Sequence, residues 1–123
     1  MPLITIWRDH RVVEDQKAVE LRDLLREAVA EALKVKVVDV EARVLDVGPF
    51  DINYAPVGIE IDTGGGKKRW RVNHRTELVK FVAQRVAEAE ILPREWLGPG
   101  KSYVWLRVVE SAFVPIGFPH LAR

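Results

Sequence analysis

The chain shows the order strand, helix, strand twice in succession, and this repetition constrains its fold more than any other feature. Residues 2–7 form a short apolar run with strand character. Residues 15–34 place leucines and alanines at helical spacing, and residues 35–47 are predicted to be mostly extended. Because strand-helix-strand crossovers are parallel and right-handed, two such units predict a four-stranded α+β sheet with both helices on one face.

The second half begins with an alternating strand at 57–61 and a turn at 62–66. Asn73 is a suitable N-cap for the second helix, which is expected to end before Pro93. A third β-rich run follows at 103–109, and a tail rich in proline and glycine closes the chain. The second half therefore repeats the element order of the first.

One domain accounts for the whole chain. A length of 123 residues suffices for a compact unit with a hydrophobic core. We assign residues 1–123 to this domain, with pseudo-repeat halves at about 2–50 and 56–113. The segment 2–6 resembles 56–60, which favours a duplicated unit over a chance succession of amphipathic elements.

Composition limits the partners that the protein can have. Hydrophobic residues make up 48% and charged residues 30% of the chain, and the net charge is +1. This composition is typical of a soluble globular protein. A net charge so close to zero creates no overall electrostatic attraction to nucleic acid or to a membrane. The sequence has neither the ~20 consecutive apolar residues of a membrane span nor a signal peptide. We therefore expect a cytoplasmic protein.

Pro2 directly follows the initiator methionine. Methionine aminopeptidases trim Met1 before small residues, so the mature chain could begin with the secondary amine of a free proline. An α-amino group has a pKa of about 7.7–8, and burial or nearby guanidinium groups lower it. Such a nitrogen would be a neutral base at physiological pH. The alternative is that Pro2 is an ordinary residue at a strand terminus, where no ladder N–H is needed.

A chain that opens Met-Pro, contains two strand-helix-strand units and has this length resembles the tautomerase superfamily. That group includes 4-oxalocrotonate tautomerase, 5-carboxymethyl-2-hydroxymuconate isomerase and macrophage migration inhibitory factor. Segments 42–44, 54–57 and 64–69 are similar to segments of the isomerase type. The resemblance implies proton transfer between carbon and oxygen of a small keto or enol carboxylic acid, without a cofactor. It also implies a homotrimer with active sites between neighbouring subunits.

The resemblance assigns roles to individual residues. Pro2 matches the catalytic base. Three arginines match positions that hold the substrate's carboxylates and polarise its carbonyl: Arg11, Arg43 and Arg71. Phe50 and Tyr54 lie in the region that supplies an aromatic wall of the pocket.

Each of these residues also has a structural interpretation. Arg11 could pair with acidic residues of the first helix and its approach, and Arg43 could pair with Glu41 or Asp46. The two aromatic residues could simply pack in the core or in an interface. The histidines His10, His74 and His120 lack the spacing of metal ligands, so we predict no metal site.

Two other functions remain open. The segment 64–75 combines basic residues with Trp70 and His74, which could grip phosphates and stack a base. The near-neutral net charge and the absence of a recognition motif argue against a nucleic-acid partner. Alternatively, the chain could be a tautomerase-fold protein without turnover that serves in assembly or signalling.

Overall fold

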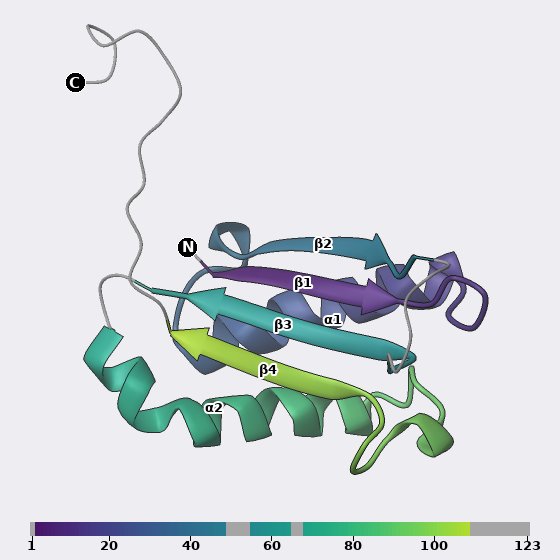
Figure 1. Cartoon of the computed structure of the whole chain (residues 1–123). Helices are drawn as coiled ribbons and strands as arrows, with labels where there is room; N and C mark the ends of the chain where they lie inside the picture. The colour runs from purple at the N-terminus through teal and green to yellow at the C-terminus, as the bar shows by residue number, and fades with distance from the viewer. Residues whose placement is uncertain (1, 49–54, 65–67, 109–123) are drawn as a thin grey trace, which may run out of the picture.

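A computed structural model describes residues 2–48, 55–64 and 68–108 of the chain, which form a four-stranded sheet with two long helices (Figure 1). In chain order the elements are β1 (Leu3–Arg8), α1 (Asp15–Leu33), the 3-10 turn η1 (Val37–Asp39), β2 (Glu41–Asp46), β3 (Val57–Thr63), α2 (Lys68–Glu88), the 3-10 turn η2 (Arg94–Trp96) and β4 (Tyr103–Val108). The sheet order is β2-β1-β3-β4. The strands within each unit are parallel, and β1 and β3 join the units in antiparallel orientation. This arrangement confirms the predicted fold class.

Both helices lie on one face of the sheet and bury its apolar side chains (Figure 1). Along β1 and β3, alternate residues point to this face, as the two-residue period of a strand requires. The core that results includes Ile4, Ile6, Leu21, Leu25, Val29, Ile59, Ile61, Leu78 and Val82. Among the described residues, neither helix has the length and apolar character needed to cross a membrane.

No helix of the described chain covers the opposite face of the sheet, which we call the open face (Figure 1). Trp105 and Tyr103 of β4 lie there with 53% and 42% of their surface exposed. A Cβ atom on Gly58 would lie 2.6 Å from the Tyr103 hydroxyl oxygen, so the glycine makes room for the tyrosine ring. Arg107 donates two hydrogen bonds to the carboxylate of Asp62, at 2.7 and 3.1 Å.

The second helix begins earlier than predicted. It starts at Lys68, so Asn73 lies within the helix and the prediction of Asn73 as its N-cap is wrong. An N-cap residue contributes only about 1 kcal/mol, which tertiary contacts readily outweigh. Here Trp70 contacts Lys34 at the end of α1, and Arg71 is buried against the end of β3. These contacts hold the additional first turn in helical form.

The segment 35–47 is also less extended than predicted. It forms η1 first, and only then β2. Arg26 of α1 donates to the carbonyl oxygens of Val37 and Val40, both at 3.1 Å. A side chain from another element therefore stabilises this turn, which the local β-rich composition does not indicate.

Candidate functional site

Pro2 lies at the end of the sheet where β1 and β2 begin and β3 and β4 end (Figure 1). The backbone N–H of Glu41 donates to its carbonyl oxygen at 3.0 Å. Leu3 pairs with Asp62, so one further step of the antiparallel register sets Pro2 opposite Thr63. Both side chains are buried. Because side chains alternate along a strand, both belong to the face that the helices cover.

Arg71 connects the first turn of α2 to this end of the sheet. Its Nη1 donates to the hydroxyl oxygen of Thr63 and, at 2.8 Å, to the carbonyl oxygen of Gly64. The residue is only 5% exposed, and within the described part of the chain its Nε has no hydrogen-bond partner. Burial lowers the pKa of the guanidinium. No carboxylate among the described residues pairs with this buried cation.

The start of α2 adds further positive potential. Its first turn holds no acidic residue, although acidic side chains are favourable at a helix N-terminus. Lys68, Arg69 and Arg71 occupy this turn instead. The free backbone N–H groups of a helix start attract anions, and the buried guanidinium lies beside them. This end of the sheet is therefore suited to bind a carboxylate or another small anion.

An aromatic pair borders the same region. The ring of Trp70 stacks on His74 with 5.1 Å between ring centroids, and the Lys34 Nζ lies 4.6 Å from the Trp70 ring. The His74 Nδ1 lies 2.9 Å from the carbonyl oxygen of Trp70. Trp70 thus contacts His74 of its own helix and Lys34, which directly follows α1. The basic segment considered for phosphate binding is therefore largely the start of a helix.

The other two predicted arginines lie elsewhere in the chain. Arg43 is on the open face, where its Nε donates to the Thr5 hydroxyl at 3.2 Å. Arg11 follows the far end of β1 and contacts the buried carboxylate of Asp9 through two hydrogen bonds, at 3.0 and 3.1 Å. Six strand residues separate this end from Pro2, which corresponds to about 20 Å. Within the chain, Arg71 therefore reaches Thr63, the residue opposite Pro2, whereas Arg43 and Arg11 lie away from this end of the helix-covered face.

The remaining predicted site residues are Phe50 and Tyr54, and both lie outside the described residues. Sequence reasoning did not identify Thr63 and Gly64 as the hydrogen-bond partners of Arg71. The alternation of side chains along β3 could have identified Thr63, because residues 59, 61 and 63 point to the same, helix-covered face. Across the described residues, no group of three or more His, Cys, Asp or Glu side chains could hold a metal ion.

Comparison with solved structures supports the fold described above. No protein-family model and no curated protein matches the sequence. Among solved structures, a fused 4-OT described as a symmetric trimer is 16% identical, with 98% of this chain and 97% of that chain covered and a TM-score of 0.65. FG41 malonate semialdehyde decarboxylase inhibited by 3-bromopropiolate is 17% identical, with 95% and 90% covered and a TM-score of 0.62. A macrophage migration inhibitory factor-like protein from Entamoeba histolytica is 12% identical, with 89% and 86% covered and a TM-score of 0.55. The chain has the fold of the tautomerase superfamily.

Proposed function

We propose that this protein is a cofactor-free tautomerase or isomerase of a small keto or enol carboxylic acid, with the nitrogen of Pro2 as its base. The observation that carries the proposal is the buried guanidinium of Arg71, which lacks a carboxylate partner in the described chain. Arg71 is bound to Thr63, the residue opposite Pro2. The likeness to tautomerase-superfamily structures supports the same assignment.

The proposed chemistry needs a base that is neutral near pH 7 and a cation where negative charge develops. A free α-amino group has a pKa of about 7.7–8, and both the buried ring of Pro2 and the nearby Arg71 favour its neutral form. The nitrogen takes a proton from the carbon acid and returns it at the other end of the conjugated system. Arg71 and the start of α2 stabilise the carboxylate and the enolate that forms between these steps.

The proposal includes a homotrimer whose sites lie between protomers. Two of the similar structures are fused 4-OT trimers, one symmetric and one asymmetric. The open face with its exposed aromatic side chains provides a surface for such an assembly. Arg11 follows the far end of β1, a strand of about 20 Å that begins directly after Pro2. In the proposed trimer, Arg11 and Arg43 serve the Pro2 of a neighbouring protomer, as carboxylate-binding groups.

The test combines the state of the N-terminus with turnover. Intact-mass spectrometry of protein from its native host determines whether Met1 has been removed. Ketonisation of phenylenolpyruvate, followed by absorbance, is then compared between wild type and two variants. Pro2→Leu should retain Met1 and lose about 10²–10⁴-fold in rate, because the displaced amine no longer acts as the base. Pro56→Ala changes the proline before β3 and should keep the wild-type rate.

Two outcomes would contradict the proposal. Equal rates for wild type and Pro2→Leu would mean that the N-terminal nitrogen takes no part in catalysis. Retention of Met1 in the native protein would turn the Pro2 nitrogen into an amide, which is not a base. Retention of Met1 together with absence of turnover would favour the alternative, a tautomerase-fold protein with an assembly or signalling role.

A further inference from the structure

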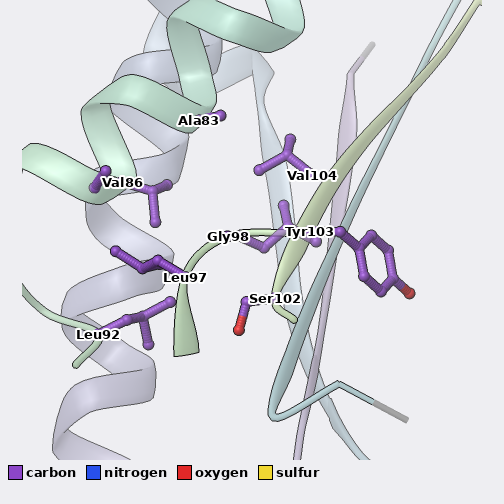
Figure 2. Close-up of a pocket in the computed structure, with 10 residues that line it drawn as sticks. Ala83, Val86, Leu92, Leu97, Gly98, Ser102, Tyr103 and Val104 are labelled. Carbon is purple, nitrogen blue, oxygen red and sulfur yellow. The ribbon is translucent and has the colours of Figure 1, made fainter. Parts of the chain in front are cut away.

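A cavity lies at the end of the sheet remote from Pro2, between α2, the start of β4 and the loop 92–98 (Figure 2). Its volume is about 180 Å³. Tyr103, which begins β4, pairs with Gly58 near the start of β3, whereas Pro2 lies at the end of these strands. The cavity is therefore separate from the proposed catalytic site.

Aliphatic side chains form the wall of this cavity, and none of its lining residues is an acid, lysine, arginine or histidine. Val86, Leu92 and Leu97 approach from the helix side, and Val104 from the sheet (Figure 2). The ring of Tyr103 points away from them, toward the open face (Figure 2). An environment of this kind favours an uncharged occupant, because a charge would lose its hydration without gaining a partner.

Small residues keep the cavity open to solvent. Ala83 and Ala87, on successive turns of α2, are exposed and contribute only methyl groups to its lining. Gly98 has a φ of 110°, a conformation that L side chains rarely adopt. The loop is fixed to the sheet by the Ser102 N–H, which donates to the Trp96 carbonyl oxygen at 2.9 Å. The opening is thus part of the fold.

Ser102 provides the polar group of the cavity. Its hydroxyl oxygen is shielded from solvent and has no hydrogen-bond partner among the described residues. A buried hydroxyl without a partner costs about 1–3 kcal/mol. Rotation about χ1 gives the serine hydroxyl three staggered positions, so it can turn toward an occupant that carries an oxygen. A ligand with one such oxygen would satisfy it.

We propose that this cavity binds a small neutral molecule the size of a single six-membered ring, with one hydrogen-bonding oxygen that pairs with the Ser102 hydroxyl. The size follows from the volume, because an apolar cavity of about 150 Å³ accommodates benzene. Phenols and cyclic alcohols or ketones belong to this class. The site requires no turnover at Pro2, so it is independent of the proposed tautomerase activity.

Phenol and toluene are matched probes, since they differ only in the hydroxyl group. Each is titrated into protein with labelled methyl groups, and binding is followed in ¹H–¹³C spectra at Val86, Leu92, Leu97 and Val104. Ser102→Ala should weaken phenol binding about five- to tenfold, the equivalent of one hydrogen bond, and leave toluene binding unchanged. Benzoate, which carries a charge, should not bind at these methyl groups.

Ala83→Leu tests the location, because the larger side chain fills the opening and should abolish binding of both probes. Gln84→Leu adds a similar side chain at the next, exposed position of α2 and should bind as wild type does. Unchanged affinity in Ala83→Leu, or shifts confined to methyl groups outside the cavity lining, would overturn the site. Equal weakening of phenol and toluene in Ser102→Ala would overturn the hydrogen bond to the ligand.

Discussion

Replacing Arg71 by methionine should separate substrate binding from stability. The substitution removes the guanidinium and keeps an unbranched side chain of similar length in a position that is only 5% exposed. If Arg71 holds a carboxylate, the variant loses a charge-assisted hydrogen bond, which contributes about 1.5–3 kcal/mol. Since 1.4 kcal/mol is a tenfold change, we expect KM for phenylenolpyruvate to rise about ten- to a hundredfold.

The effect of this substitution on stability should be small, because two contributions oppose each other. The variant loses the hydrogen bonds to Thr63 and Gly64, each of which contributes about 1.5–3 kcal/mol because the donor is charged. It also removes a buried charge that has no carboxylate partner in the described chain, whose desolvation costs several kcal/mol. We therefore expect the free energy of unfolding to change by less than about 2 kcal/mol.

Binding is measured apart from turnover with phenylacetate, a carboxylate that cannot undergo the reaction. Isothermal titration calorimetry gives its affinity for each variant. Arg71→Lys keeps the charge without the planar fork and should bind with intermediate affinity. Arg75→Met alters an exposed arginine of the same helix and serves as the control. If Arg71→Met bound phenylacetate as wild type does but lost 3–5 kcal/mol of stability, Arg71 would be a structural residue and the reasoning would be refuted.

Three further perturbations test the fold and the assembly. Burial raises the pKa of Tyr103 above its ordinary value near 10, so the folded state holds this proton more tightly than the unfolded state does. Stability that is present below about pH 10 should therefore fall as pH rises through the folded-state pKa. In denaturant unfolding, Tyr103→Phe should remove this decline, and an unchanged pH profile would contradict the prediction. Leu25→Ala should lower the free energy of unfolding by about 2–5 kcal/mol in thermal unfolding, whereas Val38→Ala, at a 76% exposed position, should lower it by less than about 0.5 kcal/mol. Similar losses in the two variants would place the core elsewhere. Trp105→Glu puts a charge on the open face and should shift the molar mass measured by light scattering toward that of the monomer, whereas Val19→Glu, on α1, should not. A trimer in both variants would exclude the open face as the interface.

Much of the fold follows from local periodicity. The helical spacing at 15–34 predicted α1, which spans Asp15–Leu33, and the alternation at 57–61 located β3. The rule that strand-helix-strand crossovers are parallel and right-handed predicted that both helices lie on one face of the sheet. This rule could not predict the order of the strands in the sheet, because no local signal in the sequence indicates which strand of the first unit pairs with which strand of the second. The antiparallel pairing of β1 with β3 depends on contacts that are distant in sequence.

The candidate site was predictable only in part for the same reason. Pro2 stood out through its position, and Arg71 through resemblance to a known family. Thr63 was assigned to a turn, because the glycines that follow it are typical of turns. Its position opposite Pro2 depends on the register between β1 and β3, and its hydrogen bond from Arg71 depends on α2 beginning before Asn73, the predicted N-cap. Both are consequences of tertiary packing rather than of local sequence.

The same register ties the site to the core. Ile4 pairs with Ile61 and Ile6 with Ile59, and all four side chains are buried beneath the helices. A slip of one residue along β3 would turn its side chains to the opposite face, moving Thr63 away from Arg71 and exposing Ile59 and Ile61 on the open face. Exposing two such side chains costs about 3–6 kcal/mol, a large part of the 5–15 kcal/mol that stabilises a typical domain. The isoleucine pairs therefore fix the register that sets Thr63, the hydrogen-bond partner of Arg71, opposite Pro2.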